Sequence, residues 1–354
     1  MLSKRVSQLI CVDAGRGRDE GTGATTTPAP DFWVRARFLL ELHRQGGKDS
    51  CIVAIQRGTV RPPLFLVHGA GGGMFWGYTN LSRALGPDQP VYVFKSIGME
   101  GGDEFTTIEA MAAHYVSELL KFQPTGAFCL GGYCFGANVA FEMARQLKAQ
   151  GRPTALVLLM NCWPHNSSYT KVKCTPTFFV KFLRNLLLRL RLQIFHFFRS
   201  PRYYFKWRAA WLWRRLSSFC SKRTEDRVIA DRIEDLFPGS CANRRLWRTH
   251  VRAWLQYIPQ RYGGKVLLLR TRGHPLVCSF DPQMGWGNLV TSGVSVRICR
   301  GDHESILDSE NVLDAARHIK AALDQIQAQP PEDHQAEWNN GQEPALGIIS
   351  SSQF

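Results

Sequence analysis

The sequence predicts a doubly wound, mostly parallel α/β sheet with a helical insertion that forms a lid. Short apolar runs of strand length alternate with amphipathic stretches of helical period along most of the chain. The run at residues 155–160 is apolar throughout, as expected of a parallel strand covered by helices on both faces. Residues 128–144 read as a strand, a glycine-rich corner and a helix. In such a sheet, we expect the functional site at the carboxyl ends of the strands.

Composition indicates a globular chain with one strongly basic region. The chain has 354 residues, of which 44% are hydrophobic and 11% aromatic, enough for one large core or two modest ones. Its formal net charge is +15. Residues 171–250 contain nineteen Lys or Arg against five Asp or Glu, so the basicity belongs to one region.

The ten cysteines show no C-x-x-C pair and no metal-ligand spacing with histidine. We therefore expect reduced thiols in a cytoplasmic protein, with no metal and no cofactor of its own. The apolar run in the first fifteen residues is too short and too interrupted by polar residues for a signal peptide. No stretch is long and apolar enough to span a bilayer.

The chain divides by composition into three parts. Residues 1–50 are expected to be a partly disordered N-terminal extension, with a linker at 15–30 and one helix at 32–43. Residues 51–326 form the predicted catalytic domain, and the polar residues 327–354 a disordered tail.

Within the domain, each element is predicted from its local pattern. Strands are short β-branched or aliphatic runs, and helices are longer periodic stretches bounded by turn residues. The predicted strands are 52–56, 64–67, 91–94, 128–130, 155–160, 265–270 and 294–299. The predicted helices are 78–85, 108–121, the segment after the corner, and 312–326.

The corner Gly132-Tyr133-Cys134-Phe135-Gly136 has the spacing of a G-x-S-x-G nucleophile elbow, with cysteine in place of serine. Glycine at both flanks lets the strand and the helix approach closely around a strained residue. Cys134 would then lie at a helix N-terminus, where the helix dipole favours the thiolate. A buried structural cysteine between two incidental glycines is the alternative.

A second glycine-rich loop, residues 68–73, follows the strand at 64–67. Together with an elbow, such a loop is a candidate oxyanion hole. We expect its donors to be the N–H groups of Ala70 and of Phe135, the residue after the nucleophile.

The lid is predicted at about residues 165–258. Residues 178–198 are aromatic and aliphatic with regularly spaced arginines, too polar to cross a membrane and too apolar to stand alone in water. We expect the apolar faces to point inward and the arginines outward.

These motifs, in this order, resemble the thioesterase family that ends nonribosomal peptide and polyketide assembly lines, whose members are α/β-hydrolases. The likeness covers about residues 52–326. It implies Cys134 as nucleophile, His303 as base, and an oxyanion hole from the Ala70 and Phe135 amides. The matching segments are residues 62–72, 85–92, 131–136 and 301–307.

In that family the acid of the triad often follows the strand after the elbow, and here that position holds Asn161. Three interpretations stay open. Asn161 orients His303, as in a Cys-His-Asn set; or Asp281, on the connection before the last strand, supplies the carboxylate; or the site is degraded and binds without turnover.

The resemblance implies a thioesterase that releases or transfers an acyl or peptidyl group from the phosphopantetheine thioester of a carrier protein met in trans. Acyl transfer or cyclisation, rather than hydrolysis, is one alternative, and a noncatalytic acyl-carrier-binding protein is another. No specific nucleic-acid partner is expected. Contact between the basic lid and a membrane surface is not favoured.

Overall fold

The computed structural model describes residues 51–58, 61–100, 103–126, 128–152, 154–172, 175–199, 244–275 and 278–328. The expected N-terminal extension with its helix at 32–43, the middle of the lid, and nearly all of the expected tail lie outside these residues. Within the described ranges, no helix combines the length and apolar character needed to cross a bilayer.

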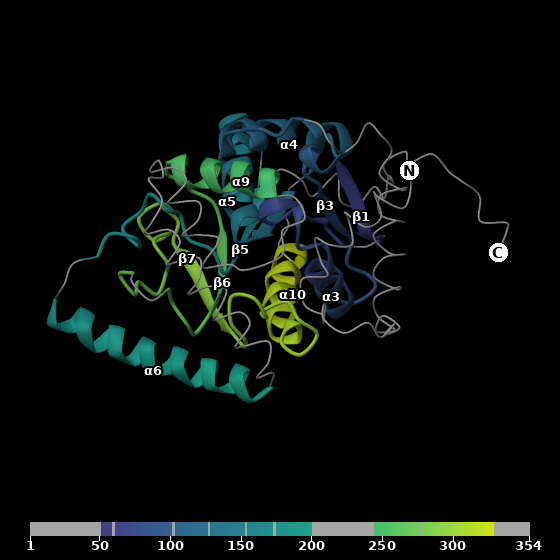
Figure 1. Ribbon diagram of the computed structural model, residues 1–354. Coiled ribbons are helices and arrows are strands. Elements are labelled where there is room, and N and C mark those ends of the chain that lie inside the picture. Colours follow the sequence, from purple (N-terminus) through teal and green to yellow (C-terminus); the bar gives the residue numbers. More distant parts are fainter. Residues whose placement is uncertain are drawn as a thin grey trace, which may run out of the picture.

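A seven-stranded sheet lies at the centre of the described domain, in the order β1-β3-β2-β4-β5-β6-β7 (Figure 1). Only β1 is antiparallel to its neighbour, so the predicted mostly parallel sheet is confirmed. The strands are β1 (Ile52–Gln56), β2 (Leu64–Val67), β3 (Val91–Phe94), β4 (Phe128–Tyr133), β5 (Thr154–Met160), β6 (Val266–Thr271) and β7 (Val294–Cys299).

Helices cover both faces of this sheet. The side chains of β2 alternate between two cores, with Phe65 and Val67 in one and Leu64 and Leu66 in the other. Helices α4 (Ile108–Phe122) and α5 (Phe135–Ala149) bury their apolar stripes in the first core. Helices α3 (Phe75–Leu85) and α10 (Val312–Ala328) bury theirs in the second. This doubly wound arrangement brings the carboxyl ends of β2 to β7 to one edge.

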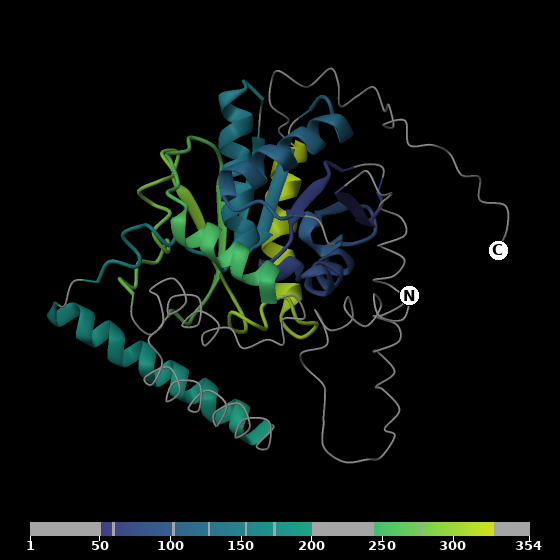
Figure 2. The ribbon, with the colours of Figure 1, turned by 45° about the horizontal axis from the view of Figure 1, so that its top comes forward.

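The described part of the lid contains α6 (Pro176–Arg199) and α9 (Arg244–Gln256). Helix α9 packs on the short helix η1 (Ala70–Gly72), which lies within the glycine-rich loop after β2. Helix α6 lies beside the body in both views (Figures 1 and 2). Its side chains Phe178 and Phe182 pack against the core, and Asn185 Nδ2 donates to the main-chain oxygens of His274 and Pro275, both at 3.2 Å.

The expectation that the apolar face of the lid points inward is wrong for α6. Six of its large apolar side chains are 47–69% exposed. At 100° per residue they lie on the side of the helix opposite Phe178, Phe182 and Asn185. The apolar surface of α6 is therefore wider than the side of the helix that contacts the described body. The exposed residues are Phe179, Val180, Leu183, Leu187, Leu190 and Ile194.

Helix α5 crosses β2 at a very short distance, and glycine makes this possible. A Cβ atom at Gly136 would overlap the main-chain oxygens of Val67 and His68. A Cβ atom at Gly132 would overlap the main chain of Gly136. The two glycines of the corner are thus required by packing between main-chain atoms, which cannot move aside.

We expect Gly136→Ala to destabilise the fold by at least about 1–3 kcal/mol, because the new methyl group forces α5 away from β2. Thermal or urea unfolding followed by circular dichroism measures the change. Gly273→Ala is the matched control, since a Cβ there meets nothing within 4 Å. Equal stability of the two variants would contradict the close approach.

Candidate active site

Cys134 lies between β4 and α5 in a strained backbone conformation. Its φ is 53° and its ψ is −112°, a region that L-residues rarely adopt. The Cys134 N–H donates to the carbonyl of Met160 at 3.0 Å, which ties the corner to the end of β5. The N–H of Phe135, the first residue of α5, hydrogen-bonds Cys134. This is the geometry of a nucleophile elbow.

Tyr78 on α3 hydrogen-bonds the main chain next to the corner. Its hydroxyl donates to the carbonyl of Val67 at 2.7 Å and accepts the N–H of Tyr133 at 2.9 Å. Asn138, one turn into α5, donates to the Cys134 carbonyl at 3.2 Å. The main chain on both sides of Cys134 is therefore fixed by buried hydrogen bonds.

Burial decides the charge state of the thiol. Desolvation raises the pKa of Cys134 to about 12, although the hydrogen bond from the Phe135 N–H opposes this. The Phe135 N–H at the helix N-terminus thus favours the thiolate as expected, but its effect is smaller than that of desolvation, and the thiol of the unliganded site is neutral.

Asn161 stands directly after β5, beside the corner in the sheet. The register pairs Tyr133 with Met160, so the residues that follow them leave neighbouring strands side by side. Asn161 has a φ of 47°, and its N–H donates to the carbonyl of Leu269 at 2.7 Å. Its amide Nδ2 lies 3.0 Å from Nδ1 of His303, while Oδ1 lies 3.4 Å from the N–H of Thr271.

His303 follows β7 and is held at this edge from two sides. Besides Asn161, the Tyr133 hydroxyl donates to the main-chain carbonyl of His303, and the two rings lie 5.0 Å apart. Burial lowers the pKa of His303 to about 4, against the charge of Asp302 and a hydrogen bond to the main chain of Asn161. The imidazole is therefore neutral at physiological pH and available as a base.

Asp281 is not brought to His303. Its two carboxylate oxygens accept the N–H groups of Gln283 at 3.0 Å and Gly285 at 2.8 Å, within its own turn. Its charge acts on Arg270 and His274 instead. Among the described residues, the geometry thus brings Asn161 rather than Asp281 to the histidine.

Ala70 begins η1, at the carboxyl end of β2 and next to the start of α5. The loop is closed by Gly69 N–H donating to Gly73 at 2.9 Å and Gly72 N–H donating to Gly69 at 3.1 Å. Gly71 has a φ of 74°, which a glycine adopts without strain.

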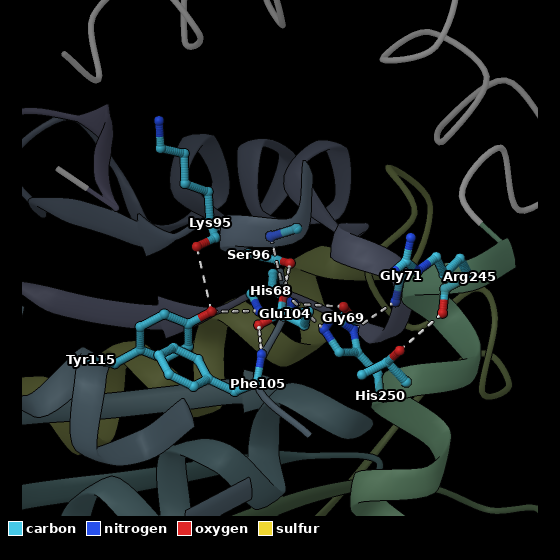
Figure 3. Close-up of polar contacts among 12 residues, drawn as sticks. His68, Gly69, Gly71, Lys95, Ser96, Glu104, Phe105, Tyr115, Arg245 and His250 are labelled. Atoms are coloured by element: carbon cyan, nitrogen blue, oxygen red, sulfur yellow. Dashed lines mark hydrogen bonds and ion pairs between the residues drawn. The ribbon is translucent and has the colours of Figure 1, made fainter. Parts of the chain in front are cut away.

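A buried polar network behind this loop was not predicted from the sequence (Figure 3). His68 Nδ1 donates to the carbonyl of Gly69 at 2.8 Å, so its Nε2 accepts the Tyr115 hydroxyl, also at 2.8 Å. His250 on α9 accepts the N–H of Gly71 at 3.0 Å and lies 3.3 Å from Glu104. Polar residues in a loop and on an amphipathic helix give no local sign that they will meet.

Within the described part of the chain, one group of residues has metal-ligand character. The ligand atoms of Cys299, Asp314 and His318 lie within 4.8 Å of one another. Both oxygens of Asp314 are already engaged, by the N–H of Arg300 at 3.0 Å and by Arg317 at 2.8 Å. The group is explained by these contacts, and we assign no metal to it.

Comparison with known proteins finds a family match in one part of the chain. Residues 62–184 match the family model described as Thioesterase domain. This range contains Ala70, Cys134, Phe135 and Asn161 but ends before Asp281 and His303. Malpibaldin synthetase of Mortierella alpina is 35% identical over 123 residues, which cover 33% of this chain and 2% of that protein. The chain thus spans only a small part of this curated relative.

Solved structures share the fold. A four-domain nonribosomal peptide synthetase, holo-AB3403, is 24% identical with a TM-score of 0.53, and covers 85% of this chain and 22% of its own. The type II thioesterase BorB, from the borrelidin biosynthetic cluster, is 16% identical with a TM-score of 0.51. That match covers 78% of this chain and 97% of BorB. The expected α/β-hydrolase fold is confirmed.

The pKa of Cys134 predicts slow alkylation at neutral pH. With a pKa of about 12, the reactive thiolate fraction rises about tenfold per pH unit from pH 7 to beyond pH 10. Iodoacetamide labelling of the Cys134 peptide, followed by mass spectrometry across this pH range, measures the dependence, and the denatured chain is the control. A rate that is already constant below pH 7 would show a stabilised thiolate and contradict the neutral thiol.

Proposed function

We propose that this chain releases or transfers an acyl or peptidyl group from the phosphopantetheine thioester of a carrier protein, because residues 62–184 match the family model described as Thioesterase domain. The observation that carries this proposal is that Cys134 and Asn161 directly follow neighbouring parallel strands at one edge of the sheet, and that Asn161 contacts His303 there. The carrier is met in trans, in the cytoplasm. The nineteen basic residues between 171 and 250 favour an acidic partner.

In the proposed reaction, a neutral thiol and a neutral imidazole react together. The Cys134 sulfur attacks the thioester carbonyl carbon while Nε2 of His303 takes the thiol proton. The carbonyl oxygen becomes an oxyanion, which the N–H groups of Ala70 and Phe135 stabilise. When the carbon–sulfur bond of the substrate breaks, the pantetheine sulfur leaves with the proton from His303. The acyl group is then held by Cys134 as a new thioester.

The second half-reaction removes the acyl group. His303 takes a proton from water, an amine or a hydroxyl as that group attacks the Cys134 thioester, and returns the proton to the Cys134 sulfur. Exchange of one thioester for another is nearly balanced in free energy, so the acyl group stays activated. This favours transfer or cyclisation alongside hydrolysis.

Asn161 positions His303 but differs from a carboxylate. A carboxylate only accepts, and it therefore keeps the ring proton on Nδ1 and leaves Nε2 free to act as base. Asn161 instead offers the ring its amide nitrogen at 3.0 Å and also a main-chain carbonyl. It thus supports both tautomers of His303, only one of which takes the thiol proton at Nε2.

A second candidate function is a noncatalytic acyl-carrier-binding protein on the same fold. Two observations favour it, the neutral Cys134 thiol and the absence of a carboxylate at position 161. Covalent acylation of Cys134 distinguishes the two functions.

We expect wild-type protein, incubated with acyl-phosphopantetheine, to gain one acyl group on Cys134, because the elbow presents this sulfur beside the oxyanion donors. Intact-mass spectrometry measures the adduct, and thiol release measures turnover. Cys134→Ala should show neither while keeping its fold by circular dichroism. An equal adduct on Cys134→Ala would remove Cys134 from the mechanism, and the absence of adduct and thiol release with every acyl donor would favour the binding protein.

Asn161→Asp should raise kcat at least about tenfold, because the carboxylate keeps the His303 proton on Nδ1. Steady-state hydrolysis of an acyl-N-acetylcysteamine thioester at several pH values measures the effect. Asp281→Asn is the control, and should leave kcat near its wild-type value because Asp281 hydrogen-bonds its own turn. A lower kcat for Asn161→Asp, or a large loss for Asp281→Asn, would contradict this role of Asn161.

A further inference from the structure

One side chain of the lid contacts both peptide segments of the proposed oxyanion hole. His250 on α9 is fully buried. Its Nδ1 accepts the N–H of Gly71, the residue after Ala70, at 3.0 Å. Its ring stacks on the ring of Phe135 with centroids 4.7 Å apart and planes 10° from parallel. Figure 3 shows His250 extending from α9 to Gly71.

The other edge of His250 faces an anchored carboxylate. Nε2 lies 3.3 Å from Oε2 of Glu104. The same carboxylate accepts the N–H groups of Gly98 at 3.2 Å and Phe105 at 2.9 Å, and the hydroxyl of Ser96. Burial alone would raise the pKa of Glu104, but the contacts with His250 and Ser96 outweigh it and hold the pKa at about 2.

The two partners of His250 specify one tautomer. The Gly71 N–H can only donate, so Nδ1 must accept. An ionised Glu104 can only accept, so Nε2 carries the proton. The ring thus lies between the glycine-rich loop and a fixed carboxylate, and only one ring orientation and tautomer makes both contacts. A residue that only fills space would not need one particular orientation.

Helix α9 also fits this loop sterically. A Cβ atom at Gly98 would lie 2.7 Å from the Leu246 side chain, and one at Gly72 would lie 3.6 Å from it. Glycine at position 98 leaves room for Leu246 of α9, whereas the distance at Gly72 is an ordinary van der Waals contact between α9 and the loop. The helix therefore rests on the loop through the His250 hydrogen bond and through apolar side chains, since Ala70 packs against the cluster of Trp247 and Val251 on α9.

We propose that His250 is a positioning residue through which the lid helix α9 sets the geometry of the oxyanion hole. The proposal deepens the proposed function and rests on it. The Gly71 N–H belongs to the peptide that joins Ala70 to Gly71, so its hydrogen bond to His250 fixes that peptide, which is one Cα atom away from the Ala70 N–H. A shift of α9 would change this contact and the stack on Phe135 together, so the lid position controls the oxyanion hole.

The test separates the hydrogen bond from the volume of the ring. His250→Phe keeps the stack on Phe135 but removes the acceptor, and should lower kcat about 10–100-fold with little change in KM. His250→Asn places an amide oxygen where Nδ1 lies, and should recover part of the loss. Arg252→Ala, an exposed position on the same helix, is the control and should match wild type. The substrate is an acyl-N-acetylcysteamine thioester.

Amide hydrogen exchange of the peptide containing residues 68–75 provides a readout without turnover. We expect faster exchange in His250→Phe than in wild type, with His250→Asn between them. Wild-type exchange and kcat in His250→Phe would overturn the positioning role, as would equal effects of the Phe and Asn variants. If the loop exchanges faster in His250→Phe than in wild type but the wild type turns over no thioester, the positioning role stands and the proposed thioesterase is rejected.

Discussion

The site depends on the strained backbone of Cys134. A φ of 53° at a residue with a side chain persists only where its surroundings over-determine it. Here the surroundings are the hydrogen bond to Met160, the Tyr78 hydroxyl that fixes Tyr133, and the two glycines that let α5 lie against β2. The same close approach brings the first turn of α5 beside the loop after β2, the two segments that carry the proposed oxyanion donors.

Burial gives this site its chemical character. The Cys134 thiol and the His303 imidazole are both neutral in the unliganded protein, because each loses more from desolvation than its hydrogen bonds return. Charge therefore develops only when a thioester carbonyl is present to receive it. The same low dielectric strengthens any hydrogen bond that main-chain N–H groups make to an oxyanion. A thiol and an imidazole that are both neutral at rest thus suit an elbow whose main-chain N–H groups stabilise the charge of the transition state.

The lid is part of the site rather than a cover over it. Helix α9 contributes His250, which lies between the η1 loop and Phe135, and Leu246, which occupies the space left by Gly98 and lies beside Gly72. Helix α6 differs, since it contacts the body along one side and exposes a continuous apolar stripe on the other. The two described lid helices therefore have separate roles, with α9 fixed to the oxyanion loop and α6 largely outside the core.

The sequence by itself determined the strands, the corner and the positions of Cys134 and His303 in the chain order. These features follow from local rules, namely the period of apolar residues and the need for glycine where main chains touch. Only the tertiary structure decided that Asn161 meets His303 across 142 residues and that His250 meets Gly71 across 179. It also decided the neutral state of Cys134, because desolvation depends on every element around a group and not on its neighbours in sequence.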